Sequence, residues 1–126
     1  METISRNTAE HYVWGGPQGV ACDGWHLVQT PELSIIEEQM PPGAREIRHR
    51  HARSRQFFFV LEGELTLEVE HHEFVLHTDH GIEISPAQAH QALNRSERHV
   101  RFLVISQPPS HGDRVEASSP SGDDQE

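Results

Sequence analysis

The segment ELTLEVE, residues 64–70, alternates strictly between polar and apolar side chains. Successive side chains of a β-strand point to opposite faces, so Leu65, Leu67 and Val69 are expected to face a core. The preceding run FFFVL, residues 57–61, does not alternate, which predicts a strand that is covered on both faces. One cover would be the interior of the protein, and the other a second sheet or a partner subunit.

Short segments of this kind, separated by turn residues, continue from residue 25 to residue 106, and no helical period persists among them. The expected strands are Trp25–Gln29, Leu33–Met40, Glu46–His51, Gln56–Leu61, Glu64–Glu70, Glu73–His77, Ile82–Ser85, His90–Leu93 and Val100–Ser106. Several short strands at this spacing predict an all-β sandwich or barrel in a single domain.

The two ends of the chain differ from this middle part. Residues 1–24 contain several glycines and are expected to form an N-terminal arm with one short strand around Tyr12–Trp14. Residues 25–108 would form the barrel. Residues 109–126 are rich in Pro, Ser, Gly and acid, so we expect an acidic, largely disordered tail.

Composition restricts the partners and the location. The formal net charge of −10 would repel a phosphate backbone, so no nucleic acid is expected as a partner. No stretch approaches the roughly 20 apolar residues of a membrane span, and the N-terminus lacks the pattern of a signal peptide. Cys22 is the single cysteine, which excludes an internal disulfide and makes a cytoplasmic location the expectation.

Two histidines, His49 and His51, are separated by one residue in an expected strand. Their side chains would therefore point to the same face and could reach one ion. Imidazole is a ligand for zinc, copper, iron and nickel. The chain contains 11 histidines, so one such pair is expected by chance and does not by itself establish a site.

The surroundings of this pair resemble the cupin superfamily. Gly43, His49, His51, Gln56 and Gly63 occur as G-x5-H-x-H-x4-Q-x6-G, which is similar to the first cupin motif. The segment GIEISPAQAHQALN, residues 81–94, is similar to the second motif, with its Pro, His and Asn in order. The resemblance covers about residues 33–106 and implies a cupin jelly-roll barrel.

The resemblance also implies a metal site. Carried over by position, the ligands of a divalent ion (Zn, Fe, Mn, Ni or Cu) would be His49, His51, Gln56 and His90. Gln56 stands where the family usually has a glutamate, so the charge of the ion would be less compensated and anionic ligands would be favoured. The second motif is also one residue short before His90, with Gln88 in place of the usual glycine.

Alternatives to metal binding remain open. The three histidines could be packed or hydrogen-bonded interior residues of a metal-free cupin, and Gln56 could bond to a histidine instead of an ion. Strand alternation would turn Arg45 and Ile47 inward with His49, and Glu46 outward. A general acid or base could come from Glu37 or Glu38, of which only one can face inward, or from Tyr12 and His26 if the arm covers the barrel mouth.

The function predicted from these features is binding of a small organic, anionic molecule by a metal in the barrel. The resemblance allows a metal-dependent enzyme of the dioxygenase, isomerase or lyase type, and whether the protein is an enzyme stays open at this point. The alternatives are a non-catalytic small-molecule binding or sensing module and a metal-free cupin similar to sugar epimerases. The apolar FFFVL strand leads us to expect a homodimer.

Overall fold

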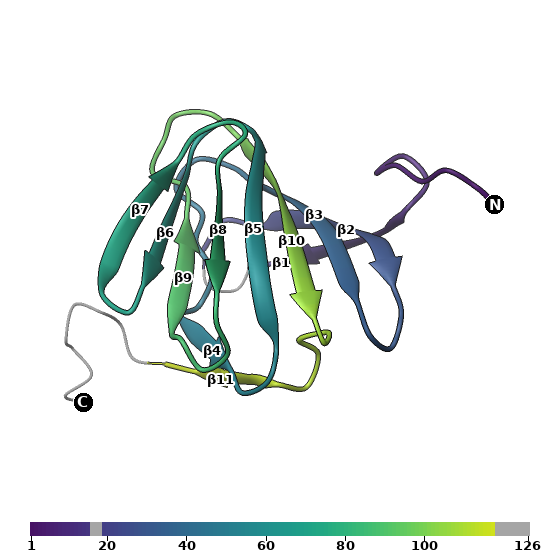
Figure 1. Cartoon of the computed structure of the whole chain (residues 1–126). Helices are drawn as coiled ribbons and strands as arrows, with labels where there is room; N and C mark the ends of the chain where they lie inside the picture. Colours follow the sequence, from purple (N-terminus) through teal and green to yellow (C-terminus); the bar gives the residue numbers. More distant parts are fainter. Residues whose placement is uncertain (16–18, 118–126) are drawn as a thin grey trace.

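The structure, a computed structural model, describes residues 1–15 and 19–117. These residues form antiparallel strands in two sheets that face each other (Figure 1). The strands are β1 (Glu10–Trp14), β2 (Cys22–Gln29), β3 (Ser34–Met40), β4 (His49–His51), β5 (Arg55–Glu62), β6 (Leu65–Val69), β7 (His72–Leu76), β8 (Gly81–Ile84), β9 (His90–Leu93), β10 (Val100–Gln107) and β11 (Arg114–Glu116). The all-β prediction is confirmed, and no described residue belongs to a helix that could cross a membrane.

The larger sheet has the order β1-β2-β3-β10-β5-β8 and the smaller sheet the order β11-β4-β9-β6-β7. Neighbouring strands are often distant in sequence, because β10 pairs with both β3 and β5, and β9 lies between β4 and β6. This interleaving is the jelly-roll arrangement that the two motifs imply. It places residues from both halves of the chain on the inner faces.

The core and the interior cavity share the same strands. On β10, Val100 and Phe102 are fully buried in the core, whereas Val104 and Ser106 further along the inner face line a cavity. On β3, Met40 is in the core and Glu38 lines the cavity. Because inward positions recur every second residue, one row of side chains changes from apolar packing to a polar site.

Leu65, Leu67 and Val69 of β6 are buried in the core as expected, but the intervening Thr66 and Glu68 are buried as well. The FFFVL strand differs from its prediction in part. Phe58 and Val60 are buried inside, but Phe57 on the outer face is 38% exposed, so the described chain does not cover both faces. A single chain therefore leaves apolar surface open on the larger sheet.

The chain ends are only partly described. β1 and the start of β2 add the N-terminal arm to the larger sheet (Figure 1). Within the segment expected to be a tail, Arg114–Glu116 forms β11 and pairs with β4. The prediction of disorder from residue 118 onward concerns residues outside those that the structure describes.

Candidate metal centre and cavity

Three buried histidines from the two motifs meet on the smaller sheet. His49 of β4 pairs directly with His90 of β9, and His51 lies two residues further along the same face of β4. The ring centroids are 4.5 Å apart for His49 and His90, and 4.8 Å apart for His49 and His51. One nitrogen from each ring lies within 4.8 Å of the other two. Small side-chain rotations would bring all three within the roughly 2.1 Å bonding distance of one ion.

Two of the three rings of this histidine cluster (His49, His51 and His90) are oriented by backbone carbonyl oxygens. Nδ1 of His49 lies 2.7 Å from the Ile47 carbonyl oxygen, and Nδ1 of His90 lies 3.0 Å from the Gln88 carbonyl oxygen. If each Nδ1–H donates there, each Nε2 keeps its lone pair for a ligand. Nδ1 of His51 is buried and has no hydrogen-bond partner within the described part of the chain.

Burial also keeps these rings neutral. It lowers the pKa of His49 and of His51 to about 4, and it lowers the pKa of His90 as well. Neutral imidazoles with available lone pairs are the form that binds divalent ions. The three histidines are therefore positioned to hold a metal ion, as their sequence pattern predicts.

Gln56 faces the same point from β5. Its side chain is buried, and its Nε2 donates a hydrogen bond of 2.9 Å to Oγ of Ser106. Its Oε1 lies 3.1 Å from Nε2 of His90. If His90 carries its proton on Nδ1, these two atoms are both acceptors, and a cation between them would relieve their repulsion. The contact also suits a histidine hydrogen bond in the other tautomer, so direct ligation by Gln56 stays a prediction.

The loop between His51 and Gln56 is held by Asp113, a residue just before β11. The carboxylate of Asp113 accepts four hydrogen bonds of 2.8–3.2 Å from the backbone N–H groups of Ala52, Arg53 and Ser54. These bonds lower the pKa of Asp113. Sequence reasoning missed this role, because Asp113 lies in a polar segment with no apolar pattern to mark it as ordered.

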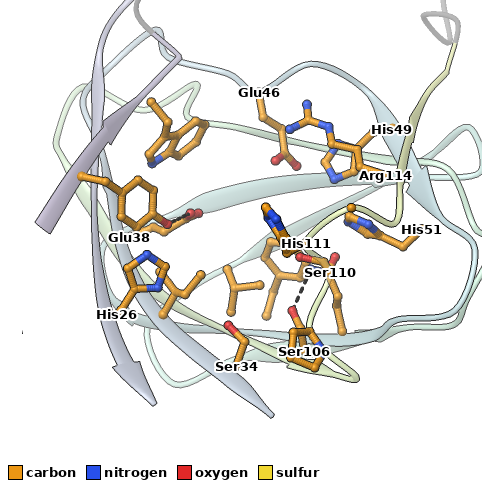
Figure 2. Close-up of a pocket in the computed structure, with 18 of the residues that line it drawn as sticks. His26, Ser34, Glu38, Glu46, His49, His51, Ser106, Ser110, His111 and Arg114 are labelled. Carbon is orange, nitrogen blue, oxygen red and sulfur yellow. Dashed lines mark hydrogen bonds between the residues drawn. The ribbon is translucent and has the colours of Figure 1, made fainter. Parts of the chain in front are cut away.

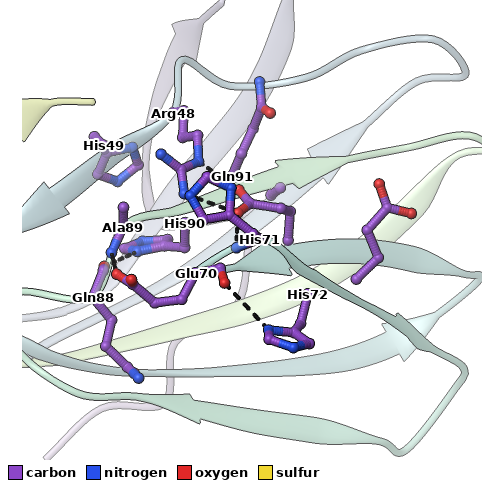
Figure 3. A network of polar contacts seen from close by, with 12 residues as sticks. Arg48, His49, Glu70, His71, His72, Gln88, Ala89, His90 and Gln91 are labelled. Atoms are coloured by element: carbon purple, nitrogen blue, oxygen red, sulfur yellow. Dashed lines mark hydrogen bonds and ion pairs between the residues drawn. The ribbon is translucent and has the colours of Figure 1, made fainter. Parts of the chain in front are cut away.

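Two polar contacts hold the segments that carry the histidines against neighbouring parts of the smaller sheet. Arg48 donates to both carboxylate oxygens of Glu68 at 2.8 and 2.9 Å, and both side chains are buried. A second contact involves Ala89, the residue directly before His90. Its N–H donates a hydrogen bond of 2.6 Å to Oε2 of Glu70 (Figure 3). The shortened second motif therefore still delivers His90 to the site.

The histidine cluster opens into a cavity of about 910 Å³ between the sheets. Figure 2 shows His49 and His51 on one side of it and His26 and Glu38 on the other. The aromatic side chains of Tyr12, Trp14 and Phe58 contribute apolar lining. The cavity therefore combines one polar cluster with flat apolar walls, as small-molecule sites commonly do.

Two carboxyl groups face this cavity. Glu38 does so while Glu37 points outward to Arg101, in agreement with the expectation that only one of the pair can face inward. Glu46 also lines the cavity, so its predicted outward orientation is wrong. The reason is that regular β4 begins only at His49, and the two-residue alternation does not extend back to Glu46. Instead, Oε2 of Glu46 accepts a hydrogen bond of 2.8 Å from the Ala92 N–H.

Burial raises the pKa of both carboxyl groups. The pKa of Glu38 rises to about 8, mainly through burial and then through the neighbouring Glu46. The pKa of Glu46 is raised by burial too. A raised pKa brings the protonated and ionised forms of a carboxyl group closer to balance at neutral pH, which suits acid–base chemistry.

The remaining predicted residues divide into two groups. Tyr12 and His26 line the cavity, as expected if the arm covers the mouth, and Arg45 lines it as strand alternation predicts. Arg114 and His111 also line it, although the sequence marked neither, because both come from the segment expected to be a tail. Five histidines outside the cavity are exposed, namely His71, His72, His77, His80 and His99.

A two-sheet antiparallel jelly roll with three inward histidines on neighbouring strands of one sheet defines a barrel protein with a potential metal centre. The chain belongs to the cupin family, since the family model "Cupin domain" matches residues 36–106. It is 28% identical over 89 residues to the uncharacterized protein MJ1618 of Methanocaldococcus jannaschii, covering 70% of this chain and 71% of that protein. The suspected resemblance is thereby confirmed.

Two further relatives carry more specific names. The polyketide synthase CurC of Streptomyces cyaneus is 30% identical over 86 residues, covering 65% of this chain but only 55% of CurC. The structure of the polyketide cyclase RemF from Streptomyces resistomycificus superposes with a TM-score of 0.77 at 14% identity, covering 94% of this chain and 87% of RemF. At that identity the likeness to RemF shows the fold alone.

Proposed function

We propose that this cupin is a metal-dependent enzyme that moves a proton at the carbon next to a carbonyl group of a small organic molecule. The observation that carries the proposal is that Glu46 faces the same cavity as the histidine cluster. His49, His51 and His90, with Gln56 as a fourth ligand, would hold the divalent ion. When bound, such an ion supplies Lewis-acid polarisation of a carbonyl oxygen.

Glu46 would act as the general base. The Ala92 N–H fixes one of its carboxyl oxygens, and Figure 2 shows the carboxyl group directed into the cavity beside Arg114 and His49. Its raised pKa makes it a stronger base than an ordinary surface glutamate. Proton removal next to a carbonyl is the step that isomerase-type and lyase-type reactions share, so these types are favoured over the dioxygenase type.

The charge around the ion supports an anionic substrate at this end of the cavity. Three neutral imidazoles and a neutral amide leave the positive charge of a divalent ion uncompensated. Arg45 and Arg114 line the cavity and add positive charge. A substrate oxygen that becomes negative as the proton leaves would be stabilised there.

The names of two relatives support carbonyl compounds as the substrate class. CurC is named as a polyketide synthase and RemF as a polyketide cyclase, and polyketides are rich in carbonyl groups. For this chain a polyketide-like carbonyl compound is a proposal. The cavity of about 910 Å³ provides room for a molecule of several rings.

Deuterium incorporation into α-tetralone, an aromatic ketone, tests this proposal. In D₂O the metal-loaded protein should incorporate deuterium next to the carbonyl, and Glu46→Gln should lose at least tenfold of the rate. Glu83→Gln, which changes an exposed carboxylate paired with Arg55, is the control and should keep the rate. Metal and ketone binding without exchange would instead indicate a non-catalytic binding module, and oxygen consumption would indicate a dioxygenase.

We also propose that the protein is a cytoplasmic homodimer that pairs through the outer face of the larger sheet. Phe57, Ile105 and Ile35 are cross-strand neighbours there, and the Arg55–Glu83 ion pair lies beside them. An apolar patch edged by both charges can pair with a second copy of itself around a two-fold axis. Light scattering at micromolar concentration should give twice the chain mass, and a monomer would contradict the proposal.

A further inference from the structure

Tyr12, Gly24 and Glu38 lie in one cross-strand row of the larger sheet, away from the histidine cluster. Tyr12 of β1 pairs with Gly24 of β2, and Gly24 pairs with Glu38 of β3. A Cβ atom on Gly24 would collide with Cζ of Tyr12 and would lie 2.5 Å from its hydroxyl oxygen. The tyrosine ring therefore lies across the space that the glycine leaves, and its hydroxyl donates a hydrogen bond of 2.9 Å to Oε2 of Glu38.

His26 completes this group from the same face of β2, two residues beyond Gly24. Its ring centroid lies 4.8 Å from that of Tyr12, and both rings line the cavity. Nδ1 of His26 is buried, and no hydrogen-bond partner for it exists within residues 1–15 and 19–117. Because Nδ1 has almost no accessible surface, the other ring nitrogen, Nε2, is the one that a ligand in the cavity could reach.

We propose that Tyr12, His26 and Glu38 form a second polar subsite that binds a neutral hydroxyl or carbonyl oxygen of the substrate. This distal subsite rests on the proposed function, because it would take the end of the substrate that the histidine cluster does not. Figure 2 shows His26 and Glu38 across the cavity from His49 and His51. A substrate that reaches both walls must carry oxygen atoms at two separated positions.

The chemistry of the distal subsite selects a neutral group over an anion. The raised pKa of Glu38 favours the protonated form of its carboxyl group at neutral pH. Glu38 can therefore donate as well as accept a hydrogen bond. Tyr12 is also kept protonated, because burial raises its pKa. A substrate carboxylate would lose water here and would lie beside the carboxyl group of Glu38. A phenol, an enol or a ketone can exchange hydrogen bonds with all three side chains.

The apolar side chains that line the cavity between the histidine cluster and the distal subsite restrict the substrate class further. Trp14 and Phe58 line the cavity together with the ring of Tyr12. Flat apolar side chains pack well against aromatic or conjugated rings. The substrate class is therefore a flat carbonyl compound that carries a hydroxyl or keto oxygen at the end remote from the metal-binding oxygens.

Three related probes test this inference: benzoylacetone, its para-hydroxy derivative and its para-carboxy derivative. Each has the same pair of carbonyl oxygens for a zinc ion on the histidine cluster, and only the far end of the ring differs. We expect the zinc-loaded full chain to bind the hydroxy derivative roughly tenfold more tightly than benzoylacetone, and the carboxy derivative more weakly. Calorimetry gives the three dissociation constants.

Variants separate the distal subsite from general effects on the fold. Glu38→Leu and Tyr12→Phe, which remove the polar groups, should bring the ratio between the hydroxy derivative and benzoylacetone close to one. Glu37→Gln, on the same strand but facing outward, should keep the tenfold ratio. Circular dichroism of each variant verifies that the fold is intact.

A second measurement does not depend on zinc. Tyr12 is the only tyrosine of the chain, so tyrosine labelled with ¹³C at Cζ gives a single protein signal. The hydroxy derivative should shift this signal even without zinc, and benzoylacetone should shift it much less. A shift without any zinc-dependent binding would contradict the proposed function but support the distal subsite. Equal affinities of the two probes, tightest binding of the carboxy derivative, or an unmoved Tyr12 signal would overturn the distal subsite.

Discussion

The two polar walls of the cavity are built in different ways. The histidine cluster lies on the smaller sheet, where each of two short motifs places its side chains through local strand geometry. The distal subsite lies on the larger sheet, where three strands meet in register around Gly24. The first wall is reinforced by the buried Arg48–Glu68 ion pair and by Asp113. The second wall depends on the absence of a side chain at Gly24, where the Tyr12 ring lies. The two walls should therefore respond differently to substitution.

Arg48→Leu should have the largest effect on the histidine wall. It leaves the Glu68 carboxylate, which is 2% exposed, without its charged partner. Removing one member of a buried ion pair costs about 3 kcal/mol or more, so the free energy of unfolding should fall by about that amount. Urea unfolding followed by circular dichroism measures it. A loss as small as that of Arg55→Leu, which breaks an exposed pair, would show that Arg48 does not reinforce this wall.

Gly24→Ala should affect the distal wall with less damage to the fold. The added Cβ collides with the far end of the Tyr12 ring, which can swing away, so we expect a stability loss of about 2 kcal/mol or less. The Tyr12–Glu38 hydrogen bond should be lost, and the Cζ signal of Tyr12 should shift. Zinc binding should be unchanged, because the histidine cluster lies on the other sheet. An unshifted Tyr12 signal would contradict the role assigned to Gly24.

Gln56→Glu tests whether Gln56 is a ligand. A carboxylate in its place would compensate part of the charge of the ion, so zinc should bind roughly tenfold more tightly, on the order of 1.4 kcal/mol. Ser106 could then donate its hydroxyl proton to the new carboxylate, which keeps the buried pair satisfied. Competition with a zinc chelator measures the affinity. Unchanged or weaker binding would argue that Gln56 only bonds to His90.

Glu38→Gln should give the smallest effect, a change in the pH dependence of stability. The folded pKa of Glu38, about 8, lies above the unfolded value near 4.5, so the folded state holds this proton more tightly. Its contribution to stability is fully present below the unfolded pKa and is lost as the pH rises through the folded pKa. Glutamine cannot ionise, so the free energy of unfolding of the variant should fall by about 1 kcal/mol less than that of the wild type as the pH rises between these two pKa values. Partial exposure of Glu38 reduces this difference.

Unfolding curves collected between about pH 5 and pH 9 would show this difference. Glu83→Gln serves as the control, because that glutamate is exposed. Parallel pH profiles for the wild type and Glu38→Gln would mean that burial does not hold the proton on Glu38.

The contrast between the walls also explains what the sequence could predict. The histidine cluster was predictable, because His49 and His51 are close in sequence and His90 follows a second recognisable motif. The distal subsite was not, because its three side chains lie on separate strands and only the register unites them. Tyr12, His26 and Glu38 could be named as candidates, but nothing in the sequence placed them together.

Two errors of prediction have local causes. Glu46 faces inward because β4 is only three residues long, whereas the sequence pattern suggested a strand from residue 46. Arg114 and Asp113 reach the site because a polar segment pairs with β4, and such pairing leaves no apolar pattern in the sequence. Strand lengths and pairings of this kind depend on tertiary contacts that periodicity does not encode.

The metal content of the protein tests the central claim most directly. Elemental analysis of protein purified without added metal should find close to one divalent ion per chain in the wild type and in His72→Ala, an exposed control histidine. His51→Ala, which removes one of the three buried rings, should lose most of that metal. Metal near zero in all three proteins, even after incubation with zinc, would contradict a metal centre at His49, His51 and His90.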